Sequence, residues 1–249
     1  MSKKTIIFSI VLILIGVTIF ESRILNEELV QAETVATISE AQTEVVAVTA
    51  AQDSVEVQEW VISVWDDMMQ RISEEEGQDW VLMSAIAYNE SRFKSNLVSK
   101  QGAIGLMQVM PIVGKQFNVA KENIADPETN IRLAGKLLKQ IDKTLKISPN
   151  ASTDDRLSII LACYNGGIGH VCDARRLAKS NGENHNSWEV VARYLKLKAD
   201  PTVYESELVR YGKFTGSRQT EAYVREVMHR YDIYRNLIDN GADMVAQVK

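Results

Sequence analysis

Cysteine, proline and histidine are scarce in this chain of 249 residues, which contains two cysteines, four prolines and three histidines. Two cysteines are too few for a disulfide scaffold. They leave open whether Cys163 and Cys172 form one disulfide or are two small buried residues in neighbouring helices. The three histidines, His170, His185 and His229, have no metal-ligand spacing with one another or with the cysteines, which argues against a zinc site.

An excess of positive charge is also absent from the main part of the chain. The net charge is −5, but residues 21–59 alone carry −8 and residues 60–249 carry +1. This balance gives no electrostatic basis for binding nucleic acid. The sequence has no internal repeat of useful length and no convincing alternation of apolar and polar residues, which disfavours repeat and β architectures.

The first twenty residues have the pattern of a targeting segment. Lys3 and Lys4 precede an almost unbroken apolar run, Thr5–Phe20, as in a secretory signal or a short membrane anchor. The run is shorter than the about 20 residues that a spanning helix needs, so cleavage and retention both stay open, with retention slightly favoured. Residues 21–54 contain no aromatic residue, glycine or proline and are predicted to form an acidic, flexible linker.

Residues 55–240 are predicted to form a compact all-α domain of seven to nine helices, followed by a C-terminal tail over residues 241–249. Asp79 is the expected N-cap of a helix that is apolar on all sides and must therefore lie in the middle of the domain. Helical spacing of apolar residues also runs through Trp60–Met68. Further helices are expected from Asp126-Pro127 onwards and over Ser152–Asn165, Ile168–Lys179, Ser187–Leu195 and Gln219–Ile238.

Glu90 ends the apolar helix that follows Asp79. An apolar neighbourhood and the negative end of the helix dipole both raise the pKa of a carboxyl group, as a proton donor near neutral pH requires. Three further segments place a hydrogen-bonding side chain beside small residues that permit close approach of a ligand. These segments are Gly102–Pro111, Ala162–Gly169 and Ala222–Val224.

In order and spacing, four motifs resemble those of the lytic transglycosylases, bacterial enzymes with a goose-type-lysozyme-like catalytic domain. The motifs are Asn89-Glu90-Ser91, Gly105-Leu106-Met107-Gln108 with Met110-Pro111, Tyr164-Asn165-Gly166, and Tyr223-Val224. The resemblance covers about residues 75–238 and is strongest to the catalytic domain of the membrane-bound F group of this family. That group also has an N-terminal solute-binding-like domain, and here only the predicted linker stands in its place.

The resemblance implies a lysozyme-like fold and a role for each matched residue. It implies that Glu90 is the single catalytic acid and base. The residues implied to line the cleft and bind the sugar strand are Ser99, Gln108, Met110, Tyr164, Asn165 and Tyr223. From the sequence alone, Ser99 is more often a turn former, Gln108 serves equally well as a loop-stabilising amide, and Asn165 also suits a helix C-cap.

The reaction implied by the resemblance is cleavage of peptidoglycan between N-acetylmuramic acid and N-acetylglucosamine, with formation of a 1,6-anhydro sugar. Most glycosidases need two carboxylates, and the four motifs contain only one, which suits a nucleophile supplied by the substrate. No metal or organic cofactor is required. The expected partner is the glycan strand, bound by a monomer in the cell envelope, on the periplasmic or another extracytoplasmic face of a membrane. Two alternatives stay open: a hydrolase of goose-type-lysozyme character and a non-catalytic peptidoglycan-binding module.

Overall fold

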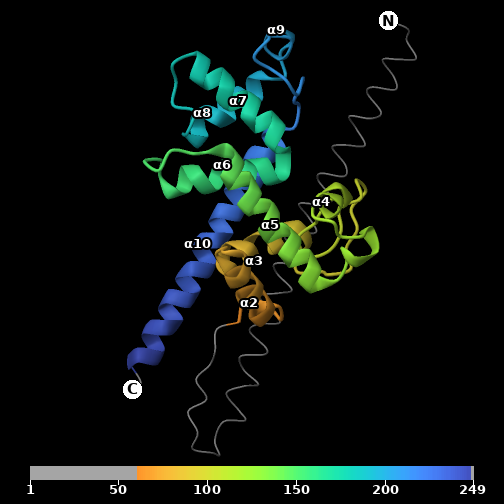
Figure 1. The fold of residues 1–249 in the computed structure, drawn as a ribbon. Helices are drawn as coiled ribbons and strands as arrows, with labels where there is room; N and C mark the ends of the chain where they lie inside the picture. Colours follow the sequence, from red (N-terminus) through yellow and green to blue (C-terminus); the bar gives the residue numbers. More distant parts are fainter. Residues whose placement is uncertain (1–60, 248–249) are drawn as a thin grey trace, which may run out of the picture. The chain divides into compact units, whose positions relative to one another are not determined.

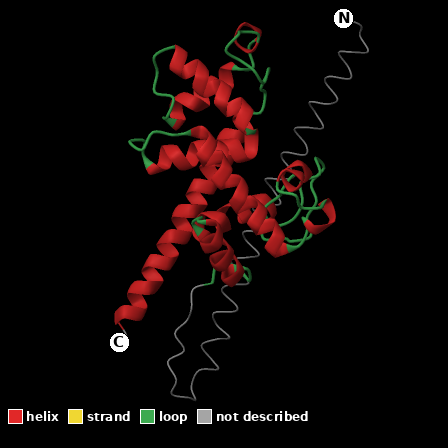
Figure 2. Cartoon of the chain, in the orientation of Figure 1, coloured by secondary structure: helices red, strands yellow, loops and turns green. Residues whose placement is uncertain are grey.

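The computed structural model describes the backbone of residues 61–247 and the side chains of residues 61–240. Within this part the chain forms nine α-helices and one short 3-10 helix (Figures 1 and 2). The all-α class and the number of helices predicted from the sequence are confirmed. The helices are α2 (Asp66–Glu76), α3 (Trp80–Ser91), α4 (Pro111–Gln116), η1 (Lys121–Asn123), α5 (Pro127–Leu145), α6 (Thr153–Gly166), α7 (Ile168–Ser180), α8 (Trp188–Leu197), α9 (Pro201–Tyr204) and α10 (Ser217–Gln247).

The predicted targeting segment and linker, residues 1–54, lie outside the described residues. Among the helices that the structure does describe, none has the length and apolar character needed to span a membrane.

Three helices begin where the sequence predicts them, and the predicted N-cap Asp79 is confirmed. The side chains of Asp79, Asp126 and Ser152 accept hydrogen bonds from backbone N–H groups in the first turns of α3, α5 and α6. Pro127 follows Asp126 at the start of α5. A backbone N–H at this position has no acceptor within the helix, so a proline there removes no helical hydrogen bond. These caps set where three of the core helices begin.

Helix α3 lies at the centre of the domain. All seven residues from Val81 to Ala87 are buried, because one side of α3 packs against α2 and another against α10. Helix α10 also packs against α6 and α8 (Figure 1). The end of α3, the end of α6 and the first half of α10 therefore belong to one packed unit, although they are far apart in the sequence.

Two predicted helix limits are wrong. Despite the helical spacing of Trp60–Met68, the described residues 61–65 are not helical, since the Asp66 carboxylate accepts hydrogen bonds from the backbone N–H groups of Ile62 and Ser63. The last helix was expected to end at Ile238, but α10 continues to Gln247, so most of the predicted tail is helical. A single glycine, as at Gly241, costs a helix only about 1 kcal/mol.

A buried ion pair joins α7 to the segment that follows α8. Asp173 and Lys198 are both fully buried, and the Lys198 Nζ donates to Asp173 Oδ2 over 2.7 Å. Burial opposes the charge of Asp173, but hydrogen bonds from Lys198 and from the backbone N–H groups of Arg210 and Tyr211 keep its pKa below its usual value. Asp173 thereby holds the segment that leads into α10.

Asp173 and Arg175, which lie two residues apart in α7, do not pair with each other. Residues three apart share a helix face and residues two apart do not, so the partner of Asp173 within α7 is Arg176, at 2.7 Å. Arg175 instead donates to the backbone carbonyls of Leu145 and His185.

Substituting Asp173→Asn leaves the Lys198 ammonium buried without its counter-charge. We expect the free energy of unfolding to fall by about 3–5 kcal/mol, the cost of breaking one partner of a buried pair. Urea denaturation measures this loss. The control is Asp142→Asn, whose partner Arg156 is about one-third exposed, and for which about 1 kcal/mol or less is expected. Equal small losses in both variants would contradict the structural role of Asp173.

Candidate active site

Glu90 lies in the last turn of α3 and is half-buried. The helix ends because Arg92 and Phe93 both adopt left-handed backbone conformations, with φ of 53° and 62°. The Arg92 N–H donates to the Tyr88 carbonyl and closes the last turn. This abrupt end places the Glu90 carboxyl group at the edge of the apolar core.

The pKa of Glu90 is raised from 4.5 to about 7, and the cause is burial of the carboxyl group. The Tyr223 hydroxyl donates to Glu90 Oε1 over 2.8 Å and opposes this rise by stabilising the carboxylate. Glu90 is therefore divided between its acid and carboxylate forms near neutral pH. A group with this balance is able to donate a proton and later accept one.

Two tyrosines from different helices lie near Glu90. Tyr164 comes from the end of α6 and Tyr223 from the first half of α10, and the pKa of each is raised well above its usual value by burial and by the charge of Glu90. The Tyr164 hydroxyl donates to the Met107 carbonyl over 2.6 Å. Helices α3, α6 and α10 and the loop before α4 thus meet at one acid.

The loop before α4 is held in shape by Gln108. Its side-chain amide donates to the carbonyls of Leu97 and Gly105, and its backbone is left-handed, with φ of 47°. Isolated β-bridges join Ile104 to Val98 and to Val109. In this structure Gln108 acts as a loop-stabilising amide, which was one of its two predicted roles.

Ser99 also has a structural contact. Its hydroxyl accepts a hydrogen bond from the Ala103 N–H over 3.0 Å and closes a turn of the same loop. Met110 stands just before α4 and is 39% exposed, which leaves its side chain available to a ligand. At the end of α6, the Asn165 side chain accepts a hydrogen bond from the Thr220 hydroxyl over 3.0 Å.

Asn130 organises the site and was not predicted. Its side chain is fully buried, accepts from the Met107 N–H over 2.7 Å, and donates to the carbonyls of Ile104 and Ile124 over 2.9 Å each. A Cβ added at Gly105 would lie 2.6–2.8 Å from the Asn130 amide, so this loop needs glycine there. The available signal was an amide at a core position of α5, where an aliphatic residue is usual.

Thr220 is a second buried polar residue at the site that was not predicted. It is 1% exposed and connects α10 to Asn165 of α6. Gly166 lies against Thr220 and Phe214, with too little room for a side chain. Small residues in this turn were predicted to permit close approach of a ligand, but Gly166 permits the close approach of Thr220 of α10.

Cys163 and Cys172 are both free thiols in the structure, the first buried and the second half-buried. In the part of the chain that the structure describes, no group of three or more histidine, cysteine, aspartate or glutamate residues is arranged to hold a metal ion.

Comparison with known proteins shows a similarity to one family. The profile of the transglycosylase SLT domain matches residues 67–187, a segment that includes Glu90, Gln108 and Tyr164. Just under half of the chain is thus similar to a transglycosylase SLT domain. Tyr223 lies beyond the matched segment, yet its hydroxyl donates directly to Glu90, so the site around Glu90 includes α10 as well.

Two similar curated proteins are much longer than this chain. It is 33% identical over 172 residues to membrane-bound lytic murein transglycosylase F of Alcanivorax borkumensis, covering 69% of this chain and 35% of that protein. It is 36% identical over 154 residues to the protein of the same name from Shewanella loihica, covering 62% and 31%. The chain thus spans about a third of the length of these relatives. Among solved structures, the lytic transglycosylase Slt of Pseudomonas aeruginosa aligns at 23% identity with a TM-score of 0.48, over 70% of this chain and 24% of that one.

The raised pKa of Glu90 has a consequence for the stability of the folded domain. Since the folded-state pKa of about 7 exceeds the usual 4.5, the native state retains a proton that the unfolded chain loses, and stability falls as the pH rises through this interval. Glu90→Gln does not titrate. Between about pH 4 and pH 8.5 the wild type should lose about 3 kcal/mol of unfolding free energy through Glu90, and the Glu90→Gln variant should not show this loss.

Urea denaturation at a series of pH values measures this difference. The control is Glu189→Gln, which removes an exposed carboxylate from α8 and should leave the difference from the wild type constant. If the Glu90→Gln and wild-type stabilities instead run parallel across this range, Glu90 has an ordinary pKa.

Proposed function

We propose that this chain is a peptidoglycan lytic transglycosylase that cleaves the β-1,4 bond between N-acetylmuramic acid and N-acetylglucosamine without water. One observation carries the proposal: a half-buried carboxyl group, Glu90, has a pKa of about 7 and is held by Tyr223 at the end of a buried helix. The SLT domain match and the names of the relatives support the same reaction.

In the first step the protonated Glu90 donates its proton to the glycosidic oxygen, and the bond from that oxygen to C1 of the muramic sugar breaks. N-acetylglucosamine leaves with the proton. The positive charge that develops at C1 is taken up by the 2-acetamido oxygen of the muramic sugar. The Tyr223 hydroxyl stabilises the carboxylate that remains on Glu90, because it already donates to Oε1.

In the second step the Glu90 carboxylate takes the proton of the 6-hydroxyl of the same muramic sugar. The freed oxygen attacks C1, displaces the acetamido group and closes the 1,6-anhydro ring. Glu90 is again protonated and ready for the next cycle. No water is consumed, and the substrate supplies its own nucleophile.

A lone acid supports this route over hydrolysis. The causes of the Glu90 pKa shift are burial and the Tyr223 hydrogen bond, and no second carboxylate of the described residues contributes to it. A retaining or inverting glycosidase needs a second carboxylate within about 5–9.5 Å to act as nucleophile or to activate water.

The remaining site residues are proposed to bind the strand directly or through the loop. Tyr164, Asn165 and Met110 are assigned to the walls of a lysozyme-like cleft, with Tyr164 and Asn165 nearest the acetamido group. Gln108 and Ser99 are assigned an indirect role, since their hydrogen bonds shape the loop that carries Met107 and Met110.

The cell envelope is the proposed location. The apolar run Thr5–Phe20 behind two lysines and the membrane-bound relatives both support export of the domain on a membrane anchor. Residues 21–54 are proposed to be the linker between anchor and domain, and the chain is proposed to act as a monomer without a cofactor.

Mass spectrometry of the fragments released from purified peptidoglycan by the full chain tests the reaction. We expect fragments that end in 1,6-anhydro-muramic acid, and we expect Glu90→Gln to lower their rate of release by at least about a hundredfold, because general acid catalysis is lost. Glu189→Gln, a matched change on the surface of α8, should keep the wild-type rate.

Fragments with reducing ends would identify a water-using hydrolase. Binding to peptidoglycan without any release of fragments would identify a non-catalytic binding module. Either result would overturn the proposed function.

A further inference from the structure

Two arginine guanidinium groups from different helices lie over the ring of Tyr88 in α3. The Arg92 Cζ is 4.1 Å from the ring centroid, and the Arg230 Cζ of α10 is 4.0 Å from it. Phe93 packs edge-on against the same ring, with the two ring centroids 5.9 Å apart. We call these four residues the Tyr88 cluster. The cluster joins the end of α3 to α10 close to Glu90.

The abrupt end of α3 depends on the Tyr88 ring. Arg92 and Phe93 both have left-handed backbones, with φ of 53° and 62°. This conformation is unfavourable for residues other than glycine and persists only where the surrounding contacts hold it. Here the contacts are a cation–π contact from Arg92 and an edge-to-face aromatic contact from Phe93, both made to Tyr88.

Arg230 brings α10 to the same ring. It follows Tyr223 by seven residues, so the two side chains share one side of α10. In α3, by contrast, Tyr88 and Glu90 are two residues apart and point to different sides of the helix. Helix α10 thus contacts the end of α3 at two points, through Tyr223 at Glu90 and through Arg230 at Tyr88. Two contacts on different sides of α3 fix its rotation as well as its distance from α10.

The charges of Arg92 and Arg230 do not contribute to the raised pKa of Glu90, which is caused by burial and opposed by the Tyr223 hydrogen bond. The titratable groups of the described residues that act together with Glu90 are Tyr164 and Tyr223. Both have a pKa well above the usual value and are therefore neutral near pH 7. Any effect of Arg230 on Glu90 is thus expected to pass through the position of Tyr223.

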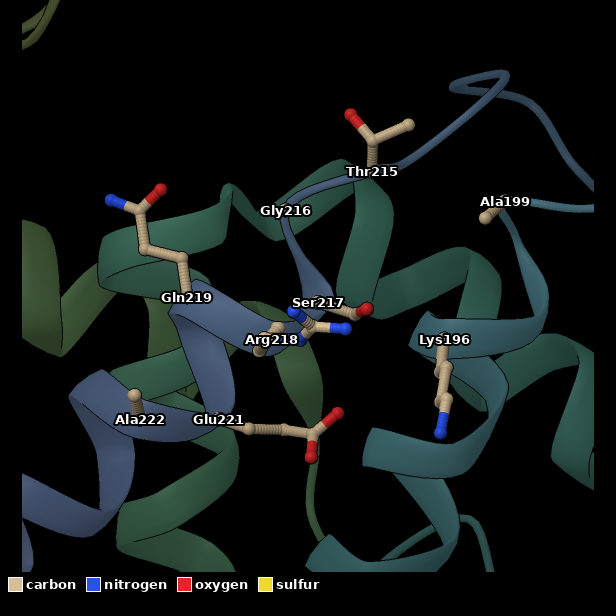
Figure 3. Close-up of a pocket in the computed structure, with 9 residues that line it drawn as sticks. All are labelled: Lys196, Ala199, Thr215, Gly216, Ser217, Arg218, Gln219, Glu221 and Ala222. Atoms are coloured by element: carbon tan, nitrogen blue, oxygen red, sulfur yellow. The ribbon is translucent and has the colours of Figure 1, made fainter. Parts of the chain in front are cut away.

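Packing on the α8 side does not hold Tyr223 in place. A pocket of about 670 Å³, lined by Lys196, Arg218 and Glu221 among others, lies between the end of α8 and the start of α10. Figure 3 shows Arg218 and Glu221 directed into this pocket, whereas Gln219 points away from it. Gln219 is one turn before Tyr223 and shares its side of α10. The position of Tyr223 therefore depends on the packing of α10 against α3 and α6.

We propose that Tyr88 is a positioning residue: Arg92 and Arg230 hold its ring, and the ring holds the end of α3 so that Glu90 stays within hydrogen-bond reach of Tyr223. The consequence for catalysis rests on the proposed function, whereas the contact between the side chains does not. Loosening the Tyr88 cluster weakens the Tyr223 hydrogen bond and removes stabilisation from the Glu90 carboxylate.

Titration of the Glu90 carboxyl carbon by ¹³C NMR tests the proposal in the full chain without any substrate. Arg230→Gln removes the guanidinium from the Tyr88 ring at a half-buried position. We expect the Glu90 midpoint to move upward, as with Tyr223→Phe, because a bond that stabilises the carboxylate is weakened. The double variant Tyr223→Phe/Arg230→Gln should have the midpoint of Tyr223→Phe alone, since the bond through which Arg230 acts is already absent.

The matched control is Arg225→Gln, which removes an exposed arginine from α10 only two residues after Tyr223 and should leave the Glu90 midpoint in place. Tyr88→Phe keeps the ring and should titrate as the wild type does, whereas Tyr88→Leu should shift the midpoint upward. An unshifted midpoint in Arg230→Gln, or an equal shift in Arg225→Gln, would overturn the proposal. So would an Arg230→Gln shift that persists in full beside Tyr223→Phe, because it would reveal a direct effect of charge.

The rate of 1,6-anhydro product release at pH 7 tests the consequence for the reaction. We expect Arg230→Gln to lower kcat by about three- to tenfold with little change in KM, as the loss of one cation–π contact that acts on the transition state predicts. Tyr88→Phe should keep the wild-type kcat. A wild-type kcat in Arg230→Gln would overturn the positioning role. A wild type that releases no anhydro product would refute the proposed function instead, and the titration would then decide the role of the Tyr88 cluster by itself.

Discussion

The hydrogen bond from the Tyr223 hydroxyl to Glu90 is the contact on which the site depends. It joins α10 to α3 across 133 residues of sequence, and it is made where burial already raises the pKa of the acid to about 7. Without this hydrogen bond, burial would raise the pKa of Glu90 further. The tyrosine moderates the effect of burial, so that both protonation states are accessible near neutral pH.

Two buried polar side chains fix the segments around this contact, namely the loop before α4 and the segment that leads into α10. Asn130 satisfies three backbone groups of the loop and the turn beside it, and so places the Met107 carbonyl where Tyr164 donates to it. Asp173, paired with Lys198, holds the backbone of Arg210 and Tyr211 just before α10. Burying a polar group is costly unless all its hydrogen bonds are made, and here the bonds that meet this cost also fix the loop and the helix that carry the site.

Much of the fold and the central acid could be predicted because they follow from local patterns. An apolar run behind Asp79 gives a central helix, and the residue that ends this helix is an acid in an apolar setting. The long-range contacts could not be predicted in the same way. Nothing in the sequence near Asn130 shows that its amide bonds to a loop 23 residues away, and the role of Gln108 depends on a left-handed backbone. The predicted last helix ended at Ile238, whereas α10 continues to Gln247.

Titration of the glutamate side-chain carboxyl carbons by ¹³C NMR tests the central claim most directly, with the Glu90 signal assigned by its absence in Glu90→Gln. The account predicts that Glu90 titrates near pH 7, well apart from the exposed glutamates, and that Tyr223→Phe moves its midpoint upward because the bond that stabilises the carboxylate is lost. A Glu90 midpoint near 4.5, or one that Tyr223→Phe leaves in place, would contradict it.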